Sequence, residues 1–154
     1  MQPRHKGGMM EGYRHILLAV DFAPESEAIL PRAVDLAQRY DAKLSLIHVV
    51  EHAPLDPANE LLLVQEANLE QQLLENARTR LAHIVQDLPL AVTGQWVELG
   101  STKTEIVRVA TEQNVDLIVV GSHGRHGLAL LLGSTANAVL HAAPCDVLAV
   151  RVKR

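Results

Sequence analysis

Short apolar runs alternate with helical patterns along this 154-residue chain, and that alternation limits the fold more than any other feature. Continuous apolar runs of about 4–8 residues are typical of strands buried on both faces of a sheet. Such a run predicts a strand at 16–20, and segments rich in strand-forming residues predict further strands at 44–50, 92–99, 116–120 and 147–152. Periodicity and start signals between them predict helices from Pro24, from 59 to 87 and from Thr102, and a last helix, capped by Ser134 or Thr135, that runs to about 143. Strict alternation requires crossovers, which are right-handed, so we expect an α/β fold: a doubly wound, five-stranded parallel sheet with helices on both faces.

Local signals add detail to these elements. Pro31 lies inside the first helical pattern and predicts a kink. Thr102 and Glu105 have the spacing of a capping box, which would start the third helix. His48 and Trp96 lie in apolar strands, and we expect His48 to be a hydrogen-bonded core histidine rather than a general base. The second helix has an apolar stripe that we assign to the core, although part of it could cover a partner: Leu62, Leu69, Leu73, Ala77, Leu81 and Ile84.

Composition excludes several classes of partner. The formal net charge is −4 and the body of the chain has no basic cluster, so nucleic acid is not an expected partner. The apolar runs are too short to span a bilayer, so no membrane partner is expected either. Cys145 is the single cysteine, which fits a reducing compartment, and we expect a cytoplasmic protein. The length favours one domain, residues 13–154, after a flexible N-terminal extension over residues 1–12.

The carboxyl ends of the predicted strands are the expected ligand site, because doubly wound sheets bind ligands where the winding direction reverses. The strand ends to consider are Asp21, Val49, Val50 and Val120. The glycine-rich segment 121–135 follows the fourth strand, and its glycines would let backbone N–H groups approach an anion at the N-terminus of the next helix. The same glycines would also suit tight turns alone. The segment has neither the lysine of a Walker loop nor the dinucleotide fingerprint.

Several motifs, in order, make the chain resemble the universal stress proteins over residues 13–153. They are Ile16-Leu-Leu-Ala-Val-Asp21, Leu46-Ile-His-Val49, Asp116-Leu-Ile-Val-Val-Gly-Ser-His-Gly-Arg125, Gly133-Ser134 and Cys145-Asp-Val-Leu-Ala-Val150. The resemblance implies a fold like that of the adenine nucleotide alpha-hydrolases. From the family's nucleotide-binding branch it also implies a site for ATP or a related adenine nucleotide, with or without Mg²⁺.

The same resemblance assigns residues to each part of the nucleotide. Asp21 and Val49 would meet the base, and Val120 and Gly121 would line the ribose. The phosphate oxygens would be held by Gly124, Gly133, Ser134 and Thr135.

The glycine-rich loop departs from that branch by one residue. Eight residues, 125–132, separate Gly124 from Gly133, where the branch has nine. Another branch of the family lacks the glycine pattern and is not known for tight ATP binding. We favour nucleotide binding and keep two alternatives: a nucleotide-free dimeric interaction protein, and a weak ATP hydrolase in which Asp21 would activate water or bind magnesium.

A phosphoacceptor role for Asp21, as in response-regulator receivers, is disfavoured. Such receivers need neighbouring acidic residues to hold magnesium, whereas Val20 and Phe22 flank Asp21. Receivers share the doubly wound fold expected here, but a shared fold does not determine function.

Neither a metal site nor a hydrolase nucleophile is expected. His123, His126 and His141 lack the spacing of metal ligands. Ser122 and Ser134 lack the Gly-x-Ser-x-Gly pattern of a nucleophile elbow.

The last predicted strand, 147–152, is expected to form a homodimer. A strand at the side of an open sheet presents unpaired N–H and C=O groups, and no proline interrupts this one. Two copies running antiparallel would satisfy those groups in a twofold interface, and the resemblance points the same way.

Overall fold

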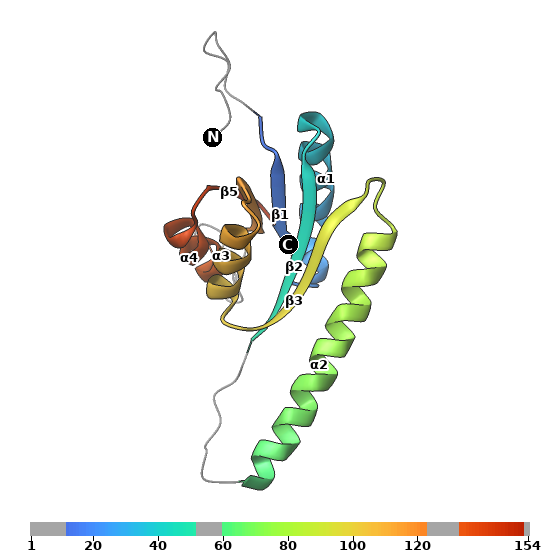
Figure 1. Ribbon diagram of the computed structural model, residues 1–154, viewed down its shortest axis with the longest axis vertical. Coiled ribbons are helices and arrows are strands. Elements are labelled where there is room, and N and C mark those ends of the chain that lie inside the picture. The colour runs from blue at the N-terminus through green and yellow to red at the C-terminus, as the bar shows by residue number, and fades with distance from the viewer. Residues whose placement is uncertain (1–11, 52–59, 123–132, 153–154) are drawn as a thin grey trace.

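The computed structural model describes residues 12–51, 60–122 and 133–152 (Figure 1). Apart from Gly12, the expected N-terminal extension over residues 1–12 lies outside these ranges, so it stays a prediction.

The described residues form a five-stranded parallel sheet with the strand order β3-β2-β1-β4-β5. The strands are β1 (His15–Ala19), β2 (Lys43–Glu51), β3 (Val92–Gly100), β4 (Leu117–Gly121) and β5 (Asp146–Val150). The helices are the short 3-10 helix η1 (Pro24–Ala28), then α1 (Ile29–Tyr40), α2 (Glu60–Gln86), α3 (Thr102–Glu112) and α4 (Ser134–Ala142). The expected doubly wound α/β fold is confirmed.

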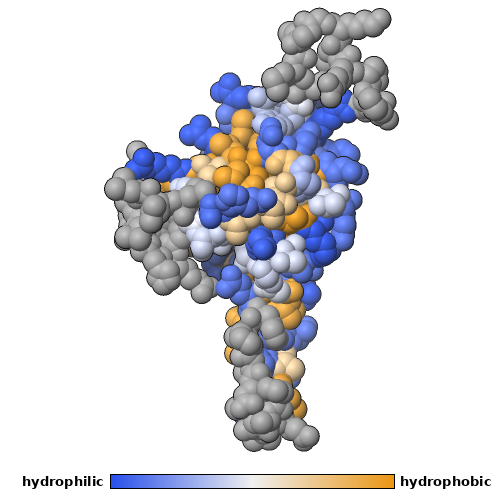
Figure 2. All heavy atoms as spheres, turned by 90° about the vertical axis from the view of Figure 1, so that its left-hand side faces the viewer, coloured by the Kyte–Doolittle hydropathy of each residue, from blue (hydrophilic) through white to orange (hydrophobic). Residues whose placement is uncertain are grey.

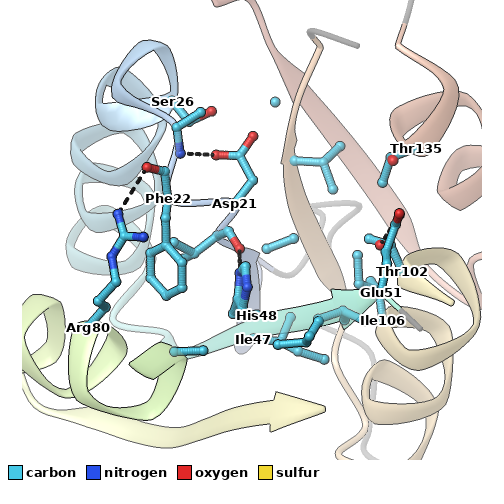
Figure 3. Close-up of a pocket in the computed structure, with 18 of the residues that line it drawn as sticks. Asp21, Phe22, Ser26, Ile47, His48, Glu51, Arg80, Thr102, Ile106 and Thr135 are labelled. Carbon is cyan, nitrogen blue, oxygen red and sulfur yellow. Dashed lines mark hydrogen bonds between the residues drawn. The ribbon is translucent and has the colours of Figure 1, made fainter. Parts of the chain in front are cut away.

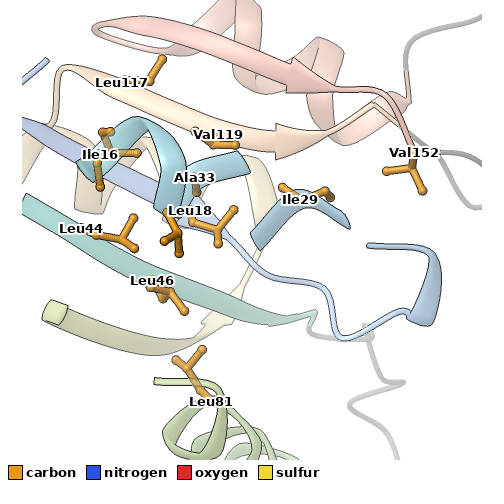
Figure 4. Close-up of a cluster of buried hydrophobic side chains, with 12 residues drawn as sticks. Ile16, Leu18, Ile29, Ala33, Leu44, Leu46, Leu81, Leu117, Val119 and Val152 are labelled. Carbon is orange, nitrogen blue, oxygen red and sulfur yellow. The ribbon is translucent and has the colours of Figure 1, made fainter. Parts of the chain in front are cut away.

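Helices cover both faces of the sheet, as the side chains of β1 show. Ile16 and Leu18 belong to a buried cluster with α1 and α2 (Figure 4), whereas Leu17 belongs to a second cluster with α3 and α4. A strand buried on both faces has apolar residues at successive positions, which explains the continuous runs in the sequence. Trp96 packs against the second cluster as a partly buried residue.

Pro31 does not kink a longer helix, so that prediction is wrong. The segment from Pro24 to Ala28 is a separate 3-10 helix, and α1 begins at Ile29. Pro31 therefore lies in the first turn of α1, where a backbone N–H has no intrahelical partner to lose.

The predicted helix caps are also wrong. The N-cap residues are Ser101 for α3 and Gly133 for α4, and in the described structure neither helix has a side-chain cap hydrogen bond. Because α3 begins at Thr102, Glu105 lies one position too late for a capping box. The hydroxyl of Thr102 instead donates to Oε1 of Glu51 at 2.9 Å.

The apolar stripe of α2 is only partly core. Leu81 is fully buried and Ala77 nearly so, but Leu69 and Leu73 are 54% and 43% exposed. At about 1.5 Å per residue, 27 residues make a helix of about 40 Å, longer than the nine-residue strand β3 on which it packs. Its first half therefore extends beyond the sheet (Figure 1), which overturns the assignment of Leu69 and Leu73 to the core. The side chain of Leu62 lies outside the described residues.

The last strand ends at Val150 rather than at residue 152. Gly121, the final residue of β4, pairs with Val150, so the ladder has no further partner. The N–H of Val152 instead reaches Oγ of Ser122 at 3.4 Å, and the Val152 side chain is buried. Across the described ranges, no helix combines the length and hydrophobicity that crossing a membrane requires.

Candidate functional site

A cleft of about 1110 Å³ opens at the carboxyl ends of β1, β2 and β4 (Figure 3). The strand order reverses between β1 and β4, because the chain winds outward through β2 and β3 and then continues on the other side. Crossovers leave the sheet in opposite directions at such a point, and the gap between them is where doubly wound proteins bind ligands. The position predicted from the strand ends is therefore the position of the cleft.

Most of the predicted site residues meet in this cleft. Those lining it are Asp21, Val49, Val120, Gly121, Ser134 and Thr135. Gly133 is buried beside it, and its N–H donates to the carbonyl oxygen of Ser122 at 2.7 Å. Gly124 lies outside the described residues, as do His123, His126 and the shortened segment 125–132.

Asp21 lies two residues after the end of β1 and is exposed. Its Oδ1 accepts the N–H of Ala23 at 2.9 Å, which closes a tight turn through Phe22. Within the described residues, Oδ2 accepts no hydrogen bond. One oxygen thus shapes the turn while the other can accept hydrogen bonds from a ligand.

Gly121 is a glycine because of close packing. A Cβ at this position would lie 2.6 Å from Cδ1 of Ile29 and 3.3 Å from Cγ2 of Val152. The end of β4 is therefore pressed against α1 and the C-terminal segment, and the cleft floor is well packed beneath Val120 and Gly121.

The N-terminus of α4 gives the cleft an anion-binding character. With Gly133 as N-cap, the first intrahelical bond runs from the N–H of Asn137 to the carbonyl oxygen of Gly133. The N–H groups of Ser134 and Thr135 precede that bond, so the helix itself offers them no acceptor. Their hydroxyl groups lie at the same place, and together with the helix dipole these donors favour a negatively charged group.

Sequence reasoning missed a cluster on the opposite wall, formed by Phe22, His48 and Arg80 (Figure 3). The rings of Phe22 and His48 lie 4.1 Å apart between centroids, tilted by 33°. The guanidinium carbon of Arg80 lies 4.4 Å from the centroid of the Phe22 ring. Arg80 comes from α2, 58 residues after Phe22, so no local motif could have pointed to it.

His48 is hydrogen-bonded as expected, but it also forms part of the cleft wall. Its Nδ1 donates to the carbonyl oxygen of Val20 at 2.6 Å. Burial lowers the pKa of His48 below its ordinary value of 6.5, and the positive charge of Arg80 acts in the same direction. The Val20 hydrogen bond and the charge of Asp21 oppose that shift. The lowered pKa favours the neutral form of His48.

Glu51 and Thr102, joined by their hydrogen bond, line the side of the cleft next to α3 and α4. The formally charged side chains lining the described cleft are thus Asp21, Glu51 and Arg80. Among the residues described, no three His, Cys, Asp or Glu side chains are grouped so as to hold a metal ion.

The fold and the cleft define a small doubly wound α/β protein with its ligand site at the point where the strand order reverses. The profile described as the Universal stress protein family matches residues 12–151. Universal stress protein A homolog 2 of Coxiella burnetii is 45% identical over 145 residues, which cover 94% of this chain and 99% of the relative.

Two solved structures support the same relationship. Universal stress protein UspA from Lactobacillus plantarum matches with a TM-score of 0.70 and 28% identity, over 92% of this chain and 99% of that one. A universal stress protein in complex with cAMP matches with a TM-score of 0.58 and 26% identity, over 90% of this chain and 97% of that one. The chain belongs to the universal stress protein family.

Proposed function

We propose that this protein binds ATP or a related adenine nucleotide in the cleft and acts as a cytoplasmic, homodimeric stress-response protein. The observation that carries the proposal is the pairing, in one cleft, of the N-terminus of α4 with the carboxylate of Asp21. The first suits a phosphate and the second suits the N–H donors of a base. A relative solved in complex with cAMP supports an adenine nucleotide as the ligand.

The proposed orientation assigns each part of the nucleotide to residues of the cleft. The base would lie near Asp21 and Val49, and the ribose over Val120 and Gly121. The phosphates would lie at Ser134 and Thr135, with Gly124 and Gly133 as further phosphate residues. Since the N–H of Gly133 already bonds to Ser122, its contribution would be the close approach that a residue without a side chain allows.

Mg²⁺ would enter with the phosphates. Magnesium sites in proteins commonly combine one or two carboxylates with phosphate oxygens and water. Glu51 is a carboxylate on the α3 and α4 side of the cleft, and the donor set fits that arrangement. When bound, the ion would neutralise phosphate charge.

The homodimer would form along β5, which pairs only with β4 among the described strands. The molecule seen from the side of α3, α4 and β5 shows hydrophobic residues between hydrophilic ones (Figure 2). Two β5 strands running antiparallel would continue the sheet across a twofold axis. The domain would span residues 13–154.

The nucleotide-free alternative has an observation of its own. The first half of α2, which extends beyond the sheet, exposes Leu63, Val64 and Leu69. Exposed apolar surface of this kind marks interaction sites. The hydrolase alternative is weaker, because Asp21 lies at the base end of the proposed orientation rather than beside the phosphates.

The test is calorimetric titration with ATP and Mg²⁺. Ser134→Asp would place a carboxylate where the phosphates are proposed to bind, so we expect it to abolish binding while leaving the helix intact or slightly stabilised. Asn137→Asp adds the same charge to the same helix but away from the cleft lining, and should retain binding. No binding by the wild-type protein, or equal binding by Ser134→Asp, would contradict the proposal. ADP release during the titration would instead favour the hydrolase.

A further inference from the structure

Phe22 has an unusual backbone conformation for a bulky residue. Its φ is +62°, in the left-handed region that residues with a large side chain rarely adopt. Such a conformation persists only when surrounding contacts hold it, and it is common at ligand sites. Because Phe22 lies between Asp21 and Ala23, its conformation allows the N–H of Ala23 to reach Oδ1 of Asp21.

Arg80 contacts both parts of Phe22. Its Nη2 donates to the Phe22 carbonyl oxygen at 3.3 Å, and its guanidinium lies over the ring at 4.4 Å from the centroid. The first contact fixes the peptide and the second fixes the side chain through a cation–π interaction. On β2, His48 stacks on the same ring and holds the carbonyl oxygen of Val20. The turn after β1 is thus held from α2 and from β2.

The position of Arg80 on α2 is itself fixed. Ala77 and Leu81, which flank Arg80 on the helix, are buried in the core, so this half of α2 is anchored against the sheet. Arginine suits the two contacts because its planar group can donate sideways while stacking on an aromatic ring, which the compact ammonium of lysine cannot do.

We propose that Arg80 is a positioning residue of the cleft: by holding Phe22 in its left-handed conformation, it orients the carboxylate of Asp21 toward the nucleobase. This inference rests on the proposed function. Arg80 would act through Phe22 and Asp21, not by contact with the phosphates. It would therefore affect discrimination between bases as well as affinity.

The variants separate this role from a simple charge effect. Arg80→Met removes both the positive charge and the planar guanidinium group, whereas Arg80→Lys keeps the charge and loses the planar group. Arg78→Met, an exposed position two residues earlier on α2 that is outside the cleft lining, is the matched control. If Arg80 attracted the ligand by charge alone, Arg80→Lys would behave as the wild type.

The first measurement uses the nucleotide-free protein. We expect amide hydrogen exchange at Ala23, followed by NMR, to be roughly tenfold faster in Arg80→Met and Arg80→Lys, because a hydrogen bond and a cation–π contact are lost. It should be unchanged in Arg78→Met. Should Arg80→Met melt below the assay temperature, Arg80→Gln, which keeps a polar side chain, takes its place.

The second measurement is the Kd for ATP and for GTP by calorimetry. We expect both Arg80 variants to bind ATP roughly tenfold more weakly, with a smaller preference for ATP over GTP. Two results would overturn this inference while leaving the proposed function intact. One is wild-type affinity for ATP in Arg80→Lys, and the other is an unchanged rate of Ala23 amide exchange in both Arg80 variants. Absence of ATP binding by the wild-type protein overturns the proposed function, and the base-orienting role with it.

Discussion

His48 on β2 donates its Nδ1 proton to the carbonyl oxygen of Val20 at the end of β1, at 2.6 Å. The bond joins neighbouring strands where the cleft begins, and burial lowers the pKa of the ring below 6.5. A neutral imidazole can make this bond with a single N–H. The protonated ring would carry a positive charge into a half-buried wall beside Arg80.

The lowered pKa of His48 predicts a loss of stability in mild acid. Unfolded protein binds the proton near the ordinary pKa of 6.5, and folded protein binds it only at lower pH. The contribution of neutral His48 to the free energy of unfolding is therefore fully present above the ordinary pKa of 6.5. It is lost as the pH falls from there through the lower pKa of the folded protein. His48→Asn keeps an N–H near the Nδ1 position without titrating. Urea unfolding from about pH 8 to about pH 5 should show a smaller stability loss in His48→Asn than in the wild type, and equal losses would contradict the prediction.

Gly121→Ala should destabilise the protein, because the new methyl group would lie 2.6 Å from Cδ1 of Ile29. We expect a cost of about 1–3 kcal/mol, typical of an overpacked core. Ile29→Val removes that same Cδ1 atom at a cost of about 1 kcal/mol. In the double variant the two free-energy costs should not add. The loss of Cδ1 makes room for the new methyl group, and the methyl group fills the space that Cδ1 leaves. Additive free energies of unfolding in urea would show that Gly121 is not constrained by Ile29.

Ala149→Pro should dissociate the proposed homodimer without unfolding the protomer. The carbonyl oxygen of Val150 accepts the N–H of Ser122, so Val150 and Leu148 turn their backbone groups toward β4. Alternate residues of a strand point the other way, so Val147 and Ala149 present theirs at the open edge. Proline at 149 removes an outward donor, whereas proline at 148 would break the ladder with β4.

Light scattering is the measurement for Ala149→Pro, with circular dichroism to confirm folding. A monomeric wild-type protein at micromolar concentration, or a folded and dimeric Ala149→Pro, would rule out this interface.

Cys145 should react slowly in the native protein. Burial, assisted by the charges of Asp116 and Asp146, raises the pKa of the thiol to about 11. At about pH 8 only about one thiol in a thousand is then ionised, roughly a hundredfold fewer than in an unfolded chain. Because Cys145 is the single cysteine, alkylation by iodoacetamide reports on it directly. Equal rates in native and urea-unfolded protein would contradict the raised pKa.

The sheet and the location of the cleft could be predicted because both depend on patterns within short segments. A continuous apolar run, as at residues 16–20, indicates a strand buried on both faces, and the residue that ends it marks the sheet edge. Asp21 and Val120 come to one cleft for that reason. The helix caps were not predictable in the same way, because an error of one position decides which residue is the cap, and Thr102 proved to be the first residue of α3 rather than its cap.

Other features depend on distances that periodicity does not encode. An apolar stripe predicts which face of α2 is inward, but not that the sheet ends before the helix does, so Leu69 and Leu73 could not be distinguished from Leu81. The contact between Arg80 and Phe22 depends on how α2 crosses the sheet. No pattern around either residue specifies it.

The central place of β1 has a consequence for the order of folding. β1 pairs with β2, which follows soon after it in the chain, and also with β4, where His15 and Asp116 meet across 101 residues. Closing so long a loop is slow and costs chain entropy before any contact rewards it. During synthesis, β1, β2 and β3 leave the ribosome before β4. We therefore expect the cleft, whose floor needs the ends of both β1 and β4, to be among the last parts of the molecule to form.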